Sequence, residues 1–304
     1  MQNLVFRSSL GAIEAPALLA VHEACFQVDQ INSHSPEEYR PNLEWHAKEL
    51  ANTDLKDWIV AILNDQVVAY GHTMWNWQER DASEVYLHLG WVMPDFRGQG
   101  IGTGLLSHLE RRCQEKARAK GHSAKLEIAA NASDSEIAAR ELLLQNDYFV
   151  AFTMLEMLLT SDTTLEFPLP LPAGYEIRPV QPEHHLAIWQ CVGDAYDTRN
   201  IGNPRFAEAI RKEDFKPYFS GDSTLWFVAW ELQSERIAGQ VLCRMLENGA
   251  GEVYEVSIGA GHWRKGIAKS LLLQAVHELR ARGSRAITLG TRQENTTQAW
   301  RLYE

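Results

Sequence analysis

A glycine-rich turn in the first half of the chain carries the strongest chemical signal. It reads Val92-Met93-Pro94-Asp95-Phe96-Arg97-Gly98-Gln99-Gly100-Ile101-Gly102, between an apolar segment and an amphipathic one. Glycine lets backbone N–H groups approach an anion closely, and a helix start adds the positive end of its dipole. Arg97 can supply a bidentate positive charge. The turn predicts a phosphate or pyrophosphate site, the alternative being a tight strand-to-helix turn without a ligand.

The glycine spacing excludes two common nucleotide-binding motifs. A P-loop needs Gly-x4-Gly-Lys-Ser/Thr, which does not occur here, and a dinucleotide fingerprint needs Gly-x-Gly-x-x-Gly. This turn instead has a glycine at every second position, from Gly98 to Gly104. An antiparallel hairpin is also expected before the turn, which does not fit the order of a dinucleotide-binding domain.

The two halves of the chain repeat. Trp58-Ile59-Val60-Ala61 recurs as Trp226-Phe227-Val228-Ala229, and Glu84-Val85-Tyr86 recurs as Glu252-Val253-Tyr254. Gly100-Ile101 of the turn recurs as Gly266-Ile267. Matches that keep their order at a slowly drifting offset indicate a tandem duplication.

The elements that position the turn follow the same order in each half. Apolar segments predict hairpins at 57–63 with 67–75 and at 225–232 with 236–246. Segments 84–92 and 252–258, rich in β-branched and aromatic residues, predict the strands before the turns. Helical spacing follows each turn, and strands are expected at 124–129 and 285–290. The predicted fold class is α/β, with a mixed, mostly antiparallel sheet and flanking helices in each of two tandem domains.

The first turn resembles motif A of the GNAT superfamily of N-acetyltransferases, whose pattern is Arg/Gln-x-x-Gly-x-Gly/Ala. All six positions are satisfied, by Arg97, Gly98, Gln99, Gly100, Ile101 and Gly102. The resemblance implies that this loop binds the pyrophosphate of acetyl-CoA. It also implies that the end of the preceding strand, at Val92 and Met93, hydrogen-bonds the pantetheine. Through the repeat, the resemblance covers nearly the whole chain and implies two GNAT-like domains.

The second copy departs from the pattern. Trp263 stands at the first Arg position and Arg264 replaces a glycine, whereas Gly266 and Ala268 keep the positions of close approach. Arg264, Lys265 and Lys269 keep positive charge there. The residues that the resemblance implies for CoA binding in this copy are Ile258, Arg264, Lys265, Gly266, Ile267, Ala268 and Asn295. Whether the second loop binds CoA or is retained for packing stays open.

The resemblance also implies groups that transfer protons. In this family a deprotonated amine attacks the thioester, and a Tyr often protonates the leaving thiolate. The stretch containing Asn295, Ala299 and Leu302-Tyr303-Glu304 resembles the segment that carries this Tyr, so Tyr303 is the expected general acid. In the first half Leu143 occupies that position, and leucine cannot donate a proton. Buried packing is the alternative for Tyr303.

The candidate bases are Glu84, His88, Glu252 and Glu255. Strand alternation predicts that Glu252 and Glu255 lie on opposite faces, so only one can point at the acetyl group. We favour Glu255, because it is unusual in an otherwise apolar strand. The alternative is a solvated or salt-bridged carboxylate.

The domain boundaries follow from a proline-rich stretch that contains Pro168, Pro170 and Pro172. We expect a first GNAT-like domain at 1–161, a linker at 162–173 and a second domain at 174–304. Segment 149–159 is expected to supply the last strands of the first sheet. The chain has no equivalent of that segment after Glu304, so the second domain is expected to lack its last strands or to close its sheet in another way.

Composition sets the remaining limits. The 304 residues carry 29 Lys plus Arg against 40 Asp plus Glu, a formal charge of −11, which argues against nucleic acid as the main partner. Cys25, Cys113, Cys191 and Cys243 form no metal spacing and are expected to be free thiols. No segment predicts a membrane span or a signal peptide, so a cytoplasmic location without a membrane partner is expected.

The function predicted from these features is transfer of an acetyl or short acyl group from CoA to the amine of a small molecule, without a metal. The alternative is a tandem module that binds or senses acyl-CoA without catalysis, which would need the glycine loop but no proton donor. A duplication that binds nothing is the third possibility. The acceptor and the oligomeric state are not predicted.

Overall fold

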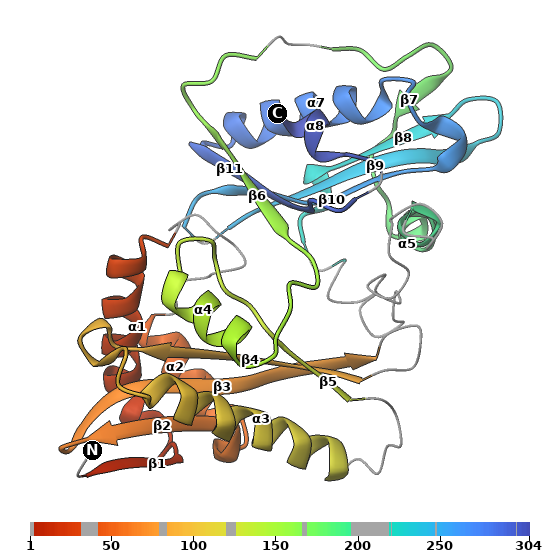
Figure 1. The fold of residues 1–304 in the computed structure, drawn as a ribbon. Coiled ribbons are helices and arrows are strands. Elements are labelled where there is room, and N and C mark those ends of the chain that lie inside the picture. The colour runs from red at the N-terminus through yellow and green to blue at the C-terminus, as the bar shows by residue number, and fades with distance from the viewer. Residues whose placement is uncertain are drawn as a thin grey trace. The chain divides into compact units, whose positions relative to one another are not determined.

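The computed structural model describes residues 3–31, 42–78, 84–119, 126–165, 169–195, 219, 221–246, 248–295 and 297–304. The chain forms two compact units, Met1–Val150 and Ala151–Glu304, here called unit 1 and unit 2. Each unit contains its own sheet with helices packed against it (Figure 1).

The sheet of unit 1 has the strand order β1 (Leu4–Ser8), β2 (Trp58–Leu63), β3 (Gln66–Gln78), β4 (Glu84–Val92) and β5 (Leu126–Ala130). Neighbouring strands are antiparallel except β4 and β5, which are parallel. The helices are α1 (Ala15–Asp29), α2 (Leu43–Asn52), α3 (Ile101–Ala119) and α4 (Ile137–Gln145). Short 3-10 turns lie at Ala12–Glu14 (η1), Leu55–Asp57 (η2) and Pro94–Phe96 (η3).

Alternation along the strands of unit 1 gives two apolar layers. Trp58, Val60 and Tyr70 pack with residues of α1 and α2 on one face, whereas Ile59 and Ala61 pack with α3 on the other. These side chains are nearly inaccessible to solvent. Removal of their apolar surface from water is the main interaction that stabilises a sheet covered on both faces.

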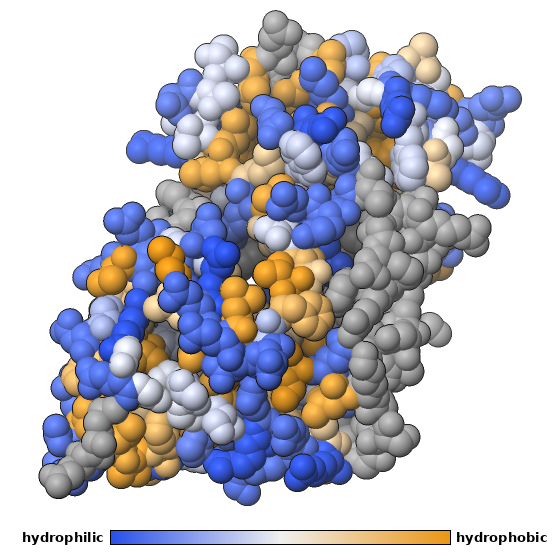
Figure 2. All heavy atoms as spheres, in the orientation of Figure 1, coloured by the Kyte–Doolittle hydropathy of each residue, from blue (hydrophilic) through white to orange (hydrophobic). Residues whose placement is uncertain are grey.

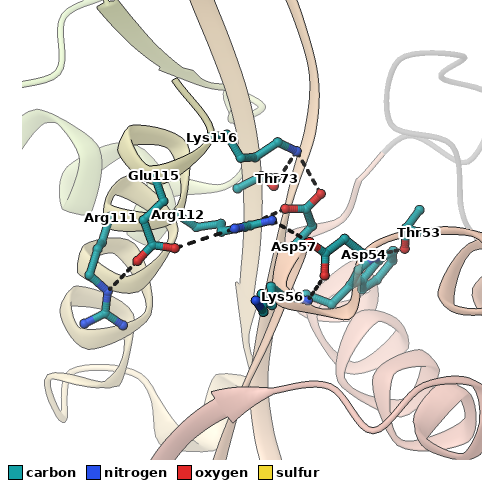
Figure 3. Close-up of polar contacts among 10 residues, drawn as sticks. Thr53, Asp54, Lys56, Asp57, Thr73, Arg111, Arg112, Glu115 and Lys116 are labelled. Atoms are coloured by element: carbon teal, nitrogen blue, oxygen red, sulfur yellow. Dashed lines mark hydrogen bonds and ion pairs between the residues drawn. The ribbon is translucent and has the colours of Figure 1, made fainter. Parts of the chain in front are cut away.

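Polar contacts fix the C-terminal half of α3 against η2, the turn that precedes β2 (Figure 3). Arg112 bonds Asp54 at 2.8 Å and Asp57 at 2.7 Å, and Lys116 bonds Asp57 at 2.8 Å. Asp54 also caps η2 by accepting the N–H of Lys56. Charged residues therefore orient the helix whose other end carries the glycine turn.

The sheet of unit 2 has the order β6 (Met154–Thr160), β11 (Ala286–Arg292), β10 (Gly251–Ile258), β9 (Arg236–Met245), β8 (Trp226–Glu231) and β7 (Tyr175–Ile177). Only β10 and β11 are parallel. The helices are α5 (His185–Ala195), α7 (Ile267–Ala281) and α8 (Trp300–Tyr303), with 3-10 turns at Pro182–His184 (η4), Ser223–Leu225 (η7) and Ala260–His262 (η8). Both sheets confirm the predicted fold class.

The expectation that 149–159 completes the first sheet is wrong. Strand β6 pairs antiparallel with β11 over seven residues, from Arg292↔Met154 to Ala286↔Thr160, and so lies in the second sheet. The physical reason is that β11 offers an open ladder edge, and Leu159 of β6 packs against the apolar core of unit 2.

The proline-rich stretch is not the boundary between the units, which lies at Val150 and Ala151. Its described residues, and the end of β6 before them, are bonded to α7. Ser270 donates to the Leu169 carbonyl at 2.7 Å, and Arg280 donates to the carbonyls of Thr160 and Thr163 at 2.9 Å each. Leu171 packs on the core of unit 2. Pro168 lies outside the described residues.

The face of the molecule in Figure 2 is mostly hydrophilic, with apolar side chains in scattered groups. In the described part of the chain, no helix is both long and apolar enough to cross a bilayer. All four cysteines are free and buried, and burial raises the pKa of each thiol.

Candidate functional site

Each sheet opens between its two parallel strands. In unit 1 the β4–β5 ladder ends at His88↔Ala130, although β4 continues to Val92 in contact with β3. In unit 2 the β10–β11 ladder ends at Val253↔Leu289, and β10 continues to Ile258 beside β9. Among the described strands, nothing pairs with the freed edge of either β4 or β10. These edges offer backbone donors and acceptors that suit an extended, amide-containing ligand.

The glycines of the first turn have two different roles. Gly98 and Gly100 have φ values of 71° and 79°, which favour glycine, and a Cβ on either would meet no atom within 4 Å. A Cβ on Gly102 would lie 3.0 Å from the Leu142 side chain, and one on Gly104 would lie 2.5 Å from the Phe6 ring. The first pair therefore shapes an open loop, and the second pair permits close packing of α3.

The second turn keeps the same backbone path with other residues. Arg264 has φ 58° at the place of Gly98, and Gly266 has φ 86° at the place of Gly100. Trp263, at the place of Arg97, donates its indole N–H to the Ile258 carbonyl at 2.8 Å. Both loops end at a helix start whose N–H groups suit an anion.

The structure does not leave the guanidinium of Arg97 free to bind an anion, contrary to expectation. Its terminal nitrogens each bond one oxygen of Asp29 at 2.7 Å, and its Nε donates to the Val92 carbonyl at 3.0 Å. Arg97 therefore ties the loop to α1 and to the end of β4.

The second loop offers more available positive charge. Lys265 Nζ donates to the Tyr175 hydroxyl at 3.1 Å, so its ammonium is partly engaged. Within the described ranges, neither Arg264 nor Lys269 forms an ion pair. Two cations beside the start of α7 fit a pyrophosphate better than the neutralised Arg97 of unit 1 does.

The other predicted loop residues hold the loops and the helices that follow them in place. Ile101 and Ile267 are buried first residues of their helices and anchor them in the cores. The Met93 N–H is bonded to the Val68 carbonyl at 2.9 Å, and Gln99 donates to the Asp95 carbonyl at 3.2 Å. Ala268 follows Ile267 in the first turn of α7.

Unit 2 brings together two of the predicted proton-transfer groups. Glu255, on β10, is 6% exposed. Burial raises the pKa of Tyr303 on α8, and the negative charge of Glu255 raises it further. The phenol of Tyr303 is therefore held in its protonated form, and the charge of Glu255 contributes to this. Ser257, which the sequence interpretation missed, donates its hydroxyl to Glu255.

A β-bulge overturns the predicted alternation. Glu252 pairs with Arg244 and Glu255 pairs with Leu242, with the register shift falling between Val253 and Glu255. Because their partners are two residues apart on β9, Glu252 and Glu255 lie on the same face. Glu252 forms an ion pair with Arg244, whereas Glu255 has the serine beside it. Asn295 accepts the Thr297 N–H at 3.0 Å and shapes the turn before α8.

Unit 1 places different chemistry at these positions. Leu87, Leu89 and Leu143 stand where unit 2 has Glu255, Ser257 and Tyr303. The carboxylate of Glu84 accepts a hydrogen bond from the Tyr86 hydroxyl at 3.1 Å. Burial, together with this bond and the charge of Glu84, raises the pKa of Tyr86 to about 12.

His88 lies at the last rung of the β4–β5 ladder. Its Nε2 is 2.8 Å from the Tyr148 hydroxyl, and burial lowers the pKa of the imidazole to about 4. The sequence interpretation named His88 only as one base among four. Its place at the end of the ladder becomes visible only from the pairing of β4 with β5, because no local sequence motif marks this position.

The face of unit 1 toward α1 and α2 is filled by rings. His72 stacks on Trp58 with centroids 4.3 Å apart, and the Tyr70 hydroxyl lies 3.2 Å from nitrogens of both His22 and His46. Burial lowers the pKa of His72 to about 3. The described residues contain no group of three or more side chains arranged to hold a metal ion.

Comparisons with known proteins identify the family of the chain. The family model described as the acetyltransferase (GNAT) family matches residues 16–142 and again 193–304. The chain therefore belongs to the GNAT acetyltransferase family and is an acyltransferase. The family resemblance of the glycine turn and the tandem arrangement are confirmed.

Individual relatives are more distant. The chain is 29% identical over 217 residues to a mycothiol acetyltransferase of Thermomonospora curvata, an alignment that covers 70% of this chain and 67% of the relative. It is 26% identical over 248 residues to a mycothiol acetyltransferase of Frankia casuarinae, covering 78% and 67%.

Two solved structures share the fold. A GCN5-related N-acetyltransferase from Sphaerobacter thermophilus matches with a TM-score of 0.77 at 23% identity, covering 100% of this chain and 91% of that one. A tandem GNAT protein from the clavulanic acid biosynthesis pathway matches with a TM-score of 0.62 at 15% identity, covering 98% and 93%.

Proposed function

We propose that unit 2 transfers an acetyl or short acyl group from acyl-CoA to the primary amine of a small molecule. The observation that carries this proposal is the position of Glu255, a buried residue on the part of β10 that lies beyond the end of its ladder with β11. The charge of Glu255 also contributes to the raised pKa of Tyr303. A carboxylate and a phenol kept protonated are the two groups that such a transfer needs.

Each residue has a role that follows from its protonation state. Glu255 accepts a proton from the amine nitrogen, and the lone pair of that nitrogen is then available to attack the thioester carbon. Tyr303 donates its phenolic proton to the sulfur as the carbon–sulfur bond breaks. The products are the amide and free CoA, and the proton taken by Glu255 returns to Tyr303 through solvent.

The loop and the freed edge of β10 suit the cosubstrate. Arg264 and Lys269 and the N–H groups at the start of α7 would hold the pyrophosphate. The edge of β10 beyond Val253 would bond the amides of the pantetheine arm. Relatives named mycothiol acetyltransferase support a small-molecule amine as the acceptor, and mycothiol-related compounds are the first class to test.

Unit 1 is proposed to bind CoA without catalysing transfer. Its loop has the open glycine geometry, but leucines replace the base, the serine and the phenol. The alternative of a chain that only senses acyl-CoA fits unit 1 better than unit 2, because a sensor needs no proton donor.

The test is a steady-state assay of CoA thiol release with acetyl-CoA and a panel of amines, together with calorimetric titration of acetyl-CoA. Glu255→Gln and Tyr303→Phe are expected to lower kcat by about 100-fold or more while acetyl-CoA still binds. The matched controls in unit 1, Glu84→Gln and Tyr148→Phe, are expected to keep kcat within about twofold. Loss of turnover in the controls but not in the unit 2 variants would overturn the assignment.

A further inference from the structure

Arg244 is a half-exposed cation on the same face of the unit 2 sheet as Glu255. It lies on β9, two residues beyond Leu242, which is the cross-strand partner of Glu255. Residues at such diagonal positions lie about 7–8 Å apart, within reach of a long side chain. Strand β8 begins at Trp226, opposite Leu242, so it does not extend alongside Arg244. The Arg244 side chain is accordingly 53% exposed on a strand whose middle is buried.

This face of the sheet is the one away from α7. Gly251 faces α7, because a Cβ on it would lie 3.0 Å from the Leu279 side chain. Side chains alternate along a strand, so the next residue, Glu252, points to the other side. A molecule that reaches Glu255 from that side therefore also meets Arg244.

Glu252 holds the guanidinium of Arg244 in one orientation. Its carboxylate accepts the Nε–H of Arg244 in an ion pair, and Glu252 is only 8% exposed. The guanidinium also lies over the Tyr254 ring, 5.2 Å from the ring centroid. Glu252 stands one residue before Val253, where the ladder of β10 with β11 ends. The fixed guanidinium thus lies beside the point where the two strands separate.

The two outer nitrogens of Arg244 are available to a ligand. Within the described part of the chain, neither Nη1 nor Nη2 forms a hydrogen bond. Because Glu252 balances the charge of the guanidinium, the pair offers N–H donors without a net positive charge. Such donors suit an uncharged oxygen, as in a hydroxyl or an amide carbonyl, and attract a carboxylate less than an unpaired arginine would.

We propose that Arg244 orients the acceptor by donating to an uncharged oxygen close to the reacting amine, an inference that rests on the acyl transfer proposed for unit 2. The amine then lies at Glu255 while the neighbouring oxygen lies at Arg244. The site selects amines with an adjacent hydroxyl or amide carbonyl over alkylamines and over amino acids with a free carboxylate. Glu252 is a positioning residue, because it sets both the orientation and the charge balance of the guanidinium.

The experiment compares three probes of similar shape: alaninamide, alanine and the alkylamine in which an isopropyl group replaces the amide. Binding to the full chain in the presence of CoA is followed by nitrogen-15 NMR of the arginine Nε–H groups, with Arg244→Lys identifying the signal. Alaninamide is expected to shift the Arg244 signal, and the alkylamine is expected to leave it in place. Equal shifts with both probes, or no shift with alaninamide, overturn the proposal.

Kinetic variants test the donor fork and the charge balance separately. Arg244→Lys keeps the charge but loses the fork, so it is expected to raise KM for alaninamide about tenfold at nearly constant kcat, without an effect on the alkylamine. Glu252→Gln removes the balancing charge, so kcat/KM for alanine relative to alaninamide is expected to rise about tenfold. A merely structural role would change all three probes alike, and that result contradicts the assignment.

Arg236→Met is the matched control, because Arg236 is an exposed arginine at the other end of β9. It is expected to leave the Arg244 signal and every KM unchanged.

Failure of this inference and failure of the proposed function give different results. If Glu255→Gln lowers kcat for every probe while Arg244→Lys changes no KM, the transfer function stands and the role of Arg244 is refuted. If alaninamide shifts the Arg244 signal but no amine is acetylated, the binding site stands and the proposed function is refuted.

Discussion

Asp29 holds Arg97 by two parallel bonds of 2.7 Å, so the most conspicuous cation of the first glycine turn is neutralised by the last residue of α1. This pair explains how a loop with two open glycines keeps a defined shape. It also shifts the emphasis for anion binding from the arginine side chain to the backbone N–H groups of the loop.

Asp29→Asn is expected to lower the free energy of unfolding of unit 1 by about 2 kcal/mol, because one partner of a charge-assisted, partly buried pair is lost. Calorimetry that resolves the two units would measure the change. Arg111→Ala, which removes an exposed pair with Glu115 at 3.9 Å, should change stability by less than about 0.5 kcal/mol. Equal effects in the two variants would contradict a special role for Asp29.

Unit 1 is expected to lose stability in acid before unit 2. Burial lowers the pKa of His72 to about 3 and that of His88 to about 4, whereas an ordinary histidine has a pKa of about 6.5, so both imidazoles are neutral in the fold. As pH falls below about 6.5, the unfolded chain binds these protons and the folded chain does not. Each of the two histidines is expected to lower the free energy of unfolding of unit 1 by about 2 kcal/mol at pH 5.

Thermal unfolding between pH 7.5 and pH 5 would measure this loss. His72→Phe should flatten the pH dependence of the unit 1 transition, because the ring stack is kept and the titrating group is removed. A slope that the variant leaves unaltered would show that other groups dominate.

Gly104→Ala is expected to destabilise unit 1 by about 1–3 kcal/mol, because its Cβ would lie 2.5 Å from the Phe6 ring. Phe6→Leu should recover part of the loss by making room. Chemical denaturation of both single variants and the double variant gives the coupling energy. Additive effects would mean that the two side chains do not meet.

Arg264→Gly is expected to weaken ligand binding without lowering stability. Glycine tolerates the φ of 58° at this position, so stability is expected to stay constant or rise by up to about 1 kcal/mol. Loss of the cation is expected to weaken acetyl-CoA binding by about fivefold. Lys269→Ala, which removes charge without altering φ, should weaken binding at constant stability. Unchanged binding in both variants would exclude this loop as the pyrophosphate site.

Leu159→Asp tests the assignment of β6. A carboxylate facing the unit 2 core is expected to lower the unit 2 transition by about 2 kcal/mol and to leave the unit 1 transition in place. Loss of stability in unit 1 instead would return the strand to the first sheet.

Local patterns predicted the fold class, the paired hairpins and both strand–turn–helix segments, because the periodicity of apolar residues and the glycines of the turns are local properties. The prediction that Glu252 and Glu255 lie on opposite faces was wrong, because a β-bulge at Tyr254 shifts the alternation. No residue type in this segment indicates a bulge. The partner of Arg97 could not be predicted either, since Asp29 is 68 residues away along the chain. The sheet that β6 joins depends on which edge is open, and that is a property of the assembled fold.

Strand β6 precedes the proline-rich stretch but belongs to the sheet that follows it. The boundary between the sequence repeats and the boundary between the folded units therefore differ by one strand. A chimera of two homologues with its crossover at the prolines would join a β6 from one parent to a β11 from the other. Crossovers placed before Ala151 would keep each sheet within one parent. The crossover point that suits recombination of this protein therefore lies upstream of the proline-rich stretch.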